Sequence, residues 1–561
     1  MIYLVFTVDR IAGAESPIQL ARYIRTAGWR PVGAEVRVTS VDRIVRLFGG
    51  RLLYGHDLSV PLRELIQNAS DAVRARRALA EDPFYEGKVV VSLKNIEGDS
   101  WRLIVEDDGI GMSERVLIGP LLEFGKSFWA SEEAQDEFPG LLSAKLCQTG
   151  RYGIGFFSTL MIAERIEVTT RRWDAAQDQA RKLTFREGLQ LRPLITKAEG
   201  ASLGQLSTRV ELHITSESVE QLLRVSNAPP PQEYVKVTLK ELIAHLCPCL
   251  GCDVFILQCD DQYEVAHYRK WYETDTLQWV RQIIFADHRT NQTVDDYLAK
   301  IAPLIHVIEG QDGEPCGRAA VAFLQIEAGI DAVGGLASRR SSRTIGGFSA
   351  SYVGAIGVEP AGPNRDSGIL LNPDKVKAWA SEQALLLAEM KLNDLENYIA
   401  AANVASLGGD PTPIATILIN RQLTTLINVY DLLVKEKEIY AVLGSPSGPV
   451  PSLSMIYHRP TPYHGIGLSA KDLNFSVATM EAWPGLRFPE HVYHRIPTSE
   501  NPASSCFLSC LERHAHSKGR ELQMEPVSNV LFGTYKGEPS SREKLAVGTE
   551  LRENAIRLSL I

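Results

Sequence analysis

Residues 61–77 read PLRELIQNASDAVRARR. Apolar side chains recur here at the i, i+3, i+4 and i+7 spacing that places them on one face of an α-helix. Glu64, Asn68 and Asp71 form a neighbouring polar stripe, because their i, i+4, i+7 spacing also brings them together. An amide oxygen can coordinate Mg²⁺ beside phosphates, and a carboxylate one turn away can deprotonate a water. Taken alone, the stretch fits an amphipathic helix with a solvated polar face at least as well.

Two extended stretches follow the predicted helix, at residues 88–95 (KVVVSLKN) and 101–112 (WRLIVEDDGIGM). Their apolar residues alternate with period two, which predicts a β-hairpin. The second stretch ends in DDGIGM, whose glycines allow a tight turn and a close approach of the backbone to a planar ligand. Asp107, at this strand end, can accept a hydrogen bond from an exocyclic amine. The motif is weak by itself, because many acidic loops contain glycines.

A glycine-rich segment, GRYGIGF, occupies residues 150–156 and precedes a predicted apolar helix and a β-branched strand. Gly150, Gly153 and Gly155 can leave backbone N–H groups and a helix N-terminus open to phosphate oxygens. The spacing differs from the dinucleotide-binding fingerprint, which also follows a first strand. A phosphate-binding loop and an ordinary turn are therefore both open for this segment alone.

The order of the three motifs, RELIQNASDA, DDGIGM and GRYGIGF, resembles that of the gyrase, heat-shock chaperone, histidine kinase and MutL (GHKL) ATPases. NASDA and GIGM are most similar to the heat-shock protein 90 type of chaperone. The resemblance is specific over about residues 60–215. It implies an α+β protein whose ATPase domain is an α/β sandwich of the histidine kinase-like fold. ATP would lie between helices and one sheet face, beneath a mobile lid.

Matching positions imply roles for individual residues. Glu64 would be the general base, Asn68 the Mg²⁺ ligand and Asp107 the carboxylate that reads adenine. Lys126, in EFGKSF, matches a lid lysine that faces phosphate, and Thr208 matches a threonine near adenine, although a serine precedes it where the family has glycine. The complete set of implied ATP-binding residues is Asn68, Asp71, Asp107, Gly109, Gly111, Met112, Lys126, Gly150, Gly153, Ile154, Gly155, Phe156 and Thr208.

A second catalytic residue is implied beyond this domain. In the family, the following domain supplies an arginine that reaches the γ-phosphate, where a guanidinium suits the charge of the transition state. The matching candidate is Arg365, in GPNRDSGILLNPDKV. Arg339, Arg340 and Arg343, in SRRSSR, compete for this role, and a solvated loop arginine is the simpler interpretation of each.

With 561 residues, the chain is long enough for several domains. We expect an N-terminal extension of unknown role (1–50), an ATP-binding domain (51–225), an α/β middle domain (232–403) and a mixed C-terminal region (411–561). The boundary after residue 225 rests on Pro229–Pro231, since three successive prolines block both helices and sheet ladders. Helices are predicted at about residues 40–50, 374–402 and 414–443.

Composition disfavours nucleic acid as the main partner, although it leaves a local basic patch open. The net charge of −9 gives little reason to expect nucleic acid as the main ligand. No run approaches the ~20 apolar residues of a membrane-spanning helix, and the first ten residues lack the features of a signal peptide, so we expect a cytoplasmic protein. Three of the eight cysteines form CPCLGC (247–252), which lacks a second ligand pair at zinc spacing, so we expect free thiols.

The resemblance predicts a chaperone-like ATPase that uses ATP and Mg²⁺ and couples nucleotide state to conformational change. A client or partner protein is implied, and the protein could form a homodimer. A histidine kinase is disfavoured because only about fifty residues precede the ATP domain. A gyrase or MutL relative would carry basic stretches for DNA. The main rival is a regulatory module of the same superfamily that binds ATP without hydrolysing it.

Overall fold

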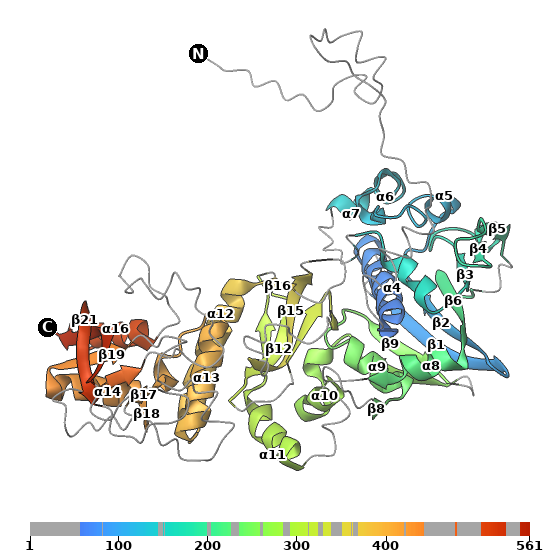
Figure 1. Ribbon diagram of the computed structural model, residues 1–561. Helices are drawn as coiled ribbons and strands as arrows, with labels where there is room; N and C mark the ends of the chain where they lie inside the picture. Colours follow the sequence, from blue (N-terminus) through green and yellow to red (C-terminus); the bar gives the residue numbers. More distant parts are fainter. Residues whose placement is uncertain are drawn as a thin grey trace, which may run out of the picture.

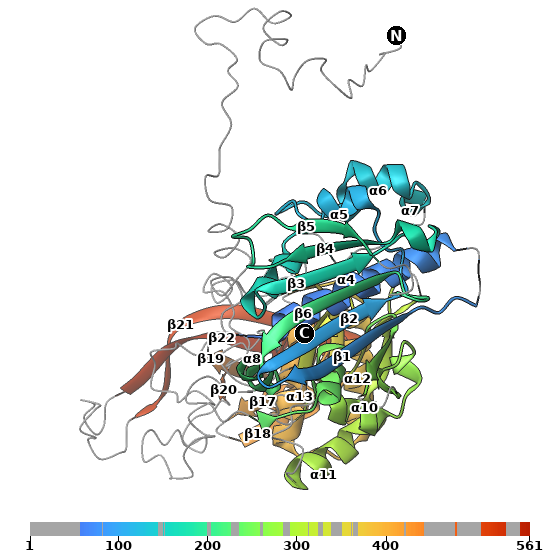
Figure 2. The same cartoon turned by 90° about the vertical axis from the view of Figure 1, so that its right-hand side faces the viewer.

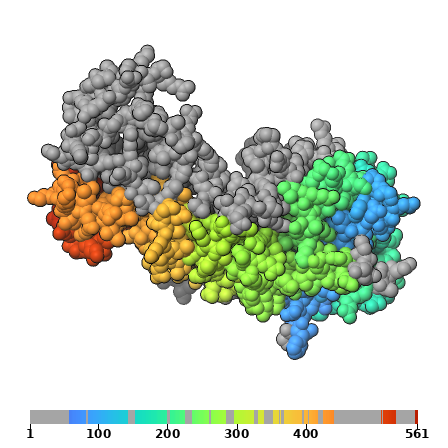
Figure 3. Space-filling model, turned by 90° about the horizontal axis from the view of Figure 1, so that it is seen from below, coloured from blue at the N-terminus to red at the C-terminus, as the bar shows by residue number. Residues whose placement is uncertain are grey.

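The computed structural model describes residues 57–80, 82, 84–143, 150, 152–198, 203–225, 235–258, 262–283, 292–311, 313–323, 329–337, 351–360, 362, 368–419, 422–442, 477–479, 507–534 and 550–561. Three large β-sheets succeed one another along the chain, and Figure 1 shows them in a row, with the N-terminal sheet at the right. Figure 3 shows the same order as a progression of colours along an elongated body. The predicted helix at 40–50 and all four candidate arginines lie outside the described residues.

The first sheet has eight strands in the order β10-β9-β1-β2-β6-β3-β4-β5. Their bounds are Lys88–Glu97 (β1), Ser100–Asp107 (β2), Arg165–Thr170 (β3), Arg181–Phe185 (β4), Leu194–Lys197 (β5), Thr208–Thr215 (β6), Asp253–Leu257 (β9) and Tyr263–His267 (β10). β1 and β2 pair antiparallel, which confirms the predicted hairpin. The β1–β9 pair is parallel. Figure 2 views this sheet face on, with the first helix behind it.

That helix, α4 (Ser59–Leu79), confirms the helix predicted from the apolar spacing. Leu62, Ile66 and Val73 are fully buried and pack in one core with Val89 and Leu103 of the sheet. Each such Leu or Ile contributes roughly 1.5–3 kcal/mol when removed from water. The apolar face therefore fixes how α4 lies on the sheet and which of its other residues face the neighbouring loops.

The sheet does not end at the triple proline, where the sequence predicts a domain boundary. β9 and β10 follow the prolines and extend the sheet beyond β1, and α9 (Leu239–Leu246) packs in the same core. Thr238 and Glu241 begin α9 with a capping box. Proline controls only the local backbone, so its position does not reveal which sheet the following strands join.

The CPCLGC segment lies between α9 and β9. Cys247 and Cys252 are fully buried in the core of the first sheet, and Cys249 is partly buried. Burial raises the pKa of the Cys252 thiol to about 12. These two thiols thus pack as small apolar side chains.

The second sheet has the path β11-β12-β15-β13-β14, with β16 paired to β15. Its strands are His306–Glu309 (β11), Pro315–Val321 (β12), Gly329–Val333 (β13), Leu336–Ala337 (β14), Tyr352–Pro360 (β15) and Gly368–Leu370 (β16). The single helix predicted at 374–402 is wrong in one respect. It is divided into α12 (Pro373–Glu389) and α13 (Asp394–Ser406), because Asn393 and Glu396 exchange hydrogen bonds that start a new helix.

The third sheet corrects the helix predicted at 414–443. That stretch forms a hairpin of β17 (Thr416–Ile419) and β18 (Gln422–Thr425), then α14 (Leu426–Glu436) and β19 (Glu438–Val442). Its Thr and Ile residues favour strands, a preference that the apolar spacing concealed. β20 (Val477–Thr479), β21 (Leu522–Thr534) and β22 (Glu550–Leu560) complete the sheet, beside α16 (Phe507–Ser517). Among the described helices, none has the length and apolar character needed to cross a bilayer.

Candidate functional site

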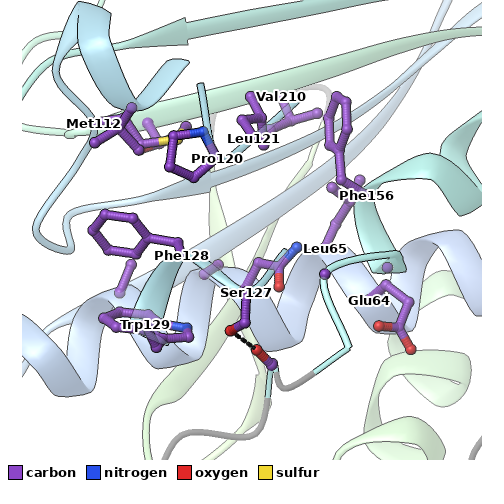
Figure 4. Close-up of a pocket in the computed structure, with 18 of the residues that line it drawn as sticks. Glu64, Leu65, Met112, Pro120, Leu121, Ser127, Phe128, Trp129, Phe156 and Val210 are labelled. Atoms are coloured by element: carbon purple, nitrogen blue, oxygen red, sulfur yellow. Dashed lines mark hydrogen bonds between the residues drawn. The ribbon is translucent and has the colours of Figure 1, made fainter. Parts of the chain in front are cut away.

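A cavity of about 180 Å³ lies between α4, the first sheet and the loops that follow β2. Figure 4 shows side chains from these elements converging on it. Most of the predicted site residues line it: Glu64, Asn68, Asp107, Gly111, Met112, Lys126, Gly150, Gly153, Ile154, Gly155, Phe156 and Thr208. The three motifs, separated by tens of residues in sequence, therefore meet around one pocket.

The polar stripe of α4 is not a solvated helix face. Glu64 and Asp71 are each only 2% exposed, and Asn68 is the one exposed residue between Val60 and Asp71. Asn68 opens onto the cavity. A buried carboxylate beside an accessible amide is the arrangement expected of a site rather than of a surface helix.

Glu64 lies where α4 meets the glycine loop. A Cβ atom at Gly155 would come within 2.4 Å of Glu64 Oε2, so only glycine lets the loop approach this carboxylate. On its other side, the guanidinium of Arg63 donates to Glu64 Oε1 at 3.4 Å. Both side chains are almost fully buried. The carboxylate is thereby held between a cation and the glycine loop at the rim of the cavity.

Two predicted ligand residues, Asp71 and Gly109, do not line the cavity. Asp71 accepts a hydrogen bond from the Gly150 N–H at 3.1 Å, which attaches the start of the glycine loop to α4. Gly109 lies against Ala72, where a Cβ would come within 2.5 Å of the helix backbone. Both residues shape the pocket by joining its loops to α4.

Asp107 ends β2, lines the cavity and is 5% exposed. Figure 4 shows Met112, from the turn that follows it, across the cavity from Glu64. Its Oδ1 accepts the N–H of Gly109 at 2.9 Å. Burial raises the pKa of the Asp107 carboxyl to about 8, with smaller contributions from the nearby Asp108 and Glu106, while the Gly109 hydrogen bond opposes the shift. A hydrogen-bond donor from a ligand would therefore meet a carboxyl group that water barely reaches.

The turn after Asp107 requires glycine. Gly111 has φ +64°, and a Cβ there would lie 1.8 Å from the Arg171 carbonyl oxygen. The N–H of Met112 donates to Thr170 Oγ1, which is itself hydrogen-bonded to the Thr208 hydroxyl at 3.1 Å. Thr208 pairs with Asp107 across β2 and β6. This end of the pocket is therefore built from strand ends in fixed register.

The glycine loop and the lid form the other end. Gly153 has φ +62° and lies against the backbone of Lys126, and Phe156 is almost fully buried. The helix expected after the loop is a short 3-10 helix, η2 (Gly155–Met161). The lid carries α5 (Glu114–Ile118), η1 (Phe128–Ala130), α6 (Glu132–Glu137) and α7 (Gly140–Ser143).

The side chain of Lys126 forms ion pairs within the lid. Its Nζ lies 2.8 Å from Glu123 and 3.6 Å from Glu133, both on the lid. The hydrogen bond to Glu123 raises the pKa of Lys126 above its usual value. The predicted phosphate-facing cation is thus paired with lid carboxylates in this conformation.

Sequence reasoning missed most of the apolar wall. Val105, Val210 and Val168 are neighbours across β2, β6 and β3 and form its sheet side. Their period-two positions could have signalled this. The remaining wall residues are Leu65, Ala69, Ala72, Ile110, Val116, Pro120, Leu121, Ser127, Phe128, Trp129 and Tyr152. Nothing in the local sequence distinguishes those of the lid.

Three features surround one cavity: a helix with one exposed amide side chain, a glycine turn at a strand end and a glycine loop. This combination suggests a known kind of domain. Residues 56–190 match the family of histidine kinase-, DNA gyrase B- and HSP90-like ATPases. The match to this ATPase family includes the candidate residues from Glu64 to Phe156 and stops before Thr208. Arg365 also lies outside it.

Curated relatives confirm the resemblance to the heat-shock protein 90 type of chaperone. Chaperone protein HtpG of Shewanella amazonensis is 35% identical over 166 residues, which is 28% of this chain and 24% of the relative. HtpG of Nitrobacter winogradskyi is 30% identical over 191 residues, or 31% and 28% of the two chains. The mitochondrial heat shock protein 75 kDa of Bos taurus is 30% identical over 174 residues, or 30% and 23%. The match therefore spans about a quarter of the length of these relatives.

Proposed function

We propose that this chain binds ATP with Mg²⁺ in the described pocket and hydrolyses it, as a chaperone-like ATPase of the heat-shock protein 90 type. The observation that supports this most strongly is the pocket itself. It brings together the exposed amide of Asn68, the buried carboxylate of Glu64 and the buried carboxyl of Asp107 around one cavity. The cavity therefore offers separate polar groups for the phosphates and for adenine.

The donors present fit a nucleotide-bound magnesium ion. Among the described residues, no three Asp, Glu, His or Cys side chains come together as a metal site. Mg²⁺ in such pockets takes one or two protein ligands and obtains the rest from phosphates and water. Asn68 would be the protein ligand. When bound, the ion supplies neutralisation of the charge that develops on the phosphates.

Glu64 would act as the general base. Its carboxylate touches the glycine loop, next to the position where the chain would hold the terminal phosphate, and can accept a proton from the attacking water. Its pairing with Arg63 holds the carboxylate in position beside the glycine loop. The adenine ring would be held by Asp107, Gly111, Met112 and Thr208. The glycine loop would hold the phosphates.

Coupling to the rest of the chain is part of the proposal. Tyr152 of the glycine loop donates its hydroxyl hydrogen to the carbonyl oxygen of Pro360, at the end of β15 in the second sheet. The next residues of the chain include Arg365, which we propose reaches the γ-phosphate. A nucleotide that alters the glycine loop would thereby act on the second sheet, and through it on a bound client protein or a second copy of the chain.

The decisive experiment combines nucleotide-binding calorimetry with steady-state phosphate release by the purified full chain. Magnesium-dependent binding of ATP together with phosphate release is the expected result. Binding without turnover would instead support the regulatory module that holds ATP without hydrolysing it. Absence of binding in a folded protein would contradict both.

A further inference from the structure

One segment of the lid lies directly on the glycine loop. The hydroxyl of Ser127 donates to the Gly150 carbonyl oxygen, and the N–H of Gly125 donates to the Gly153 carbonyl oxygen at 3.1 Å. Figure 4 shows the first of these bonds as a dashed line, with Trp129 beside it. The start and the middle of the short segment 125–129 are thus tied to the loop, which places Phe128 and Trp129 next to it.

Trp129 places a hydrogen-bond donor at this junction. A Cβ atom built on Gly150 would lie 3.6 Å from the indole Nε1, and Figure 4 shows the nitrogen-bearing edge of the ring turned toward Ser127. The ring packs edge to face on Phe128, with centroids 5.1 Å apart. Within the described part of the chain, the indole N–H has no hydrogen-bond partner. Trp129 is partly exposed, and because an indole can only donate, its N–H can donate to an acceptor of a bound ligand in place of water.

The position of this donor indicates which part of a ligand it would meet. The same point on Gly150 lies 3.8 Å from Asn68 Oδ1, the proposed magnesium ligand. Asp71 Oδ2, at 3.7 Å, already accepts the Gly150 N–H. Lys126, the proposed phosphate-facing cation of the lid, is paired with Glu123 and Glu133. The indole N–H is therefore a lid donor beside Gly150 and Asn68, where we propose that the phosphates lie.

We propose that Trp129 is a nucleotide-binding residue that donates its indole N–H to a phosphate oxygen of ATP. The inference rests on the proposed function, because it requires the cavity to hold a nucleotide with its phosphates at Gly150. A phosphate oxygen is a charged acceptor, so the bond belongs to the stronger class of hydrogen bonds. The ring of Trp129 would also cover the phosphates on their lid side and exclude water there.

The test measures the affinities of adenosine, AMP, ADP and ATP with magnesium for the full-length wild type and for Trp129→Phe. Phenylalanine keeps an aromatic ring but lacks the N–H, so adenosine should bind both proteins equally. ATP should bind the variant about ten-fold more weakly or worse. The first member of the series to show the loss identifies the phosphate that Trp129 contacts. Trp101→Phe serves as the matched control, since the indole N–H of Trp101 donates to Ser216, the first residue of the helix after β6, and Trp101 does not line the cavity.

The outcomes separate this inference from the proposed function. Equal loss of adenosine and ATP affinity would assign Trp129 to packing alone and overturn the inference, and so would wild-type affinity of the variant for every ligand. A wild type that binds none of the four ligands would overturn the proposed function, and the inference with it.

Discussion

The two ends of the pocket are built in different ways. At the base end, where we propose that adenine lies, Asp107 and Thr208 are paired residues of neighbouring strands, and the turn through Gly111 is packed against the loop that follows β3. At the phosphate end, a lid segment and a glycine loop meet through a few hydrogen bonds, and Lys126 is held by lid carboxylates. The base end is therefore formed before any ligand arrives, whereas the phosphate end depends on how loops are arranged.

The largest effect should follow from Glu64→Ala, which tests the phosphate end. The substitution removes the proposed base but no contact to adenine, so hydrolysis should fall by about 10²–10⁴-fold while ATP affinity is kept or slightly improved. Phosphate release and calorimetry on the same sample measure both quantities. A folded variant with wild-type turnover would exclude Glu64 as the base and favour the non-hydrolysing module.

Asp107→Asn tests the base end. Above pH 8, where Asp107 is ionised, the amide would lack the charge-assisted hydrogen bond to the exocyclic amine, worth roughly 1.5–3 kcal/mol, so ATP affinity should fall by about 10–150-fold. Asp108→Asn is the matched control, because Asp108 accepts from the Lys88 N–H and the Tyr85 hydroxyl and does not line the cavity. If Asp107→Asn and wild type bind ATP with equal affinity, Asp107 does not bind adenine in the way proposed.

The same residue predicts a pH dependence of the nucleotide-free protein. Burial raises the pKa of Asp107 to about 8, so the folded chain keeps a proton that the unfolded chain releases near its ordinary pKa of about 4. The stability this residue contributes is complete below about pH 4 and is lost as the pH rises through 8. Relative to Asp107→Asn, the wild type should lose up to about 1.4 kcal/mol of unfolding free energy per pH unit between pH 5 and 7. Denaturant unfolding of both proteins measures this, and a pH-independent difference would contradict it.

The smallest effect concerns the lid. Glu123→Gln would release Lys126 from an exposed ion pair, which contributes little, so ATP affinity should rise by no more than roughly 5-fold. Glu132→Gln is the control for the change in charge, because Glu132 lies on the same lid but is not one of the two carboxylates described as paired with Lys126. If both variants bind ATP equally, Lys126 is not restrained by Glu123 in the way proposed.

Local patterns in the sequence predict the base end better than the phosphate end. Period-two alternation and the glycines of DDGIGM locate β1, β2 and the turn after Asp107, because strand pairing and positive φ leave marks within a few residues. No such local pattern points to Trp129 or Tyr152. Their roles depend on contacts with Gly150 and Pro360, which are distant in sequence, so no pattern within the lid or the loop could reveal them.

The larger errors in the fold have the same cause. The strands β9 and β10 join the first sheet through pairing between Val89 and Val254, a contact that no local rule predicts. The break between α12 and α13 is different, because the Asn393 and Glu396 pair is a readable helix start inside a long apolar pattern. The apolar spacing of residues 374–402 predicts one helix and conceals this helix start.

The parallel pairing of β1 with β9 also bears on how the chain is made. Val89 leaves the ribosome about 165 residues before its partner Val254, a delay of roughly 10–30 seconds at synthesis rates of about 5–20 residues per second. During that time β1 is an edge strand with unpaired backbone groups and an apolar run at Val89–Val91. The nascent protein therefore passes through an aggregation-prone interval that ends only when residues 253–257 emerge and cover it.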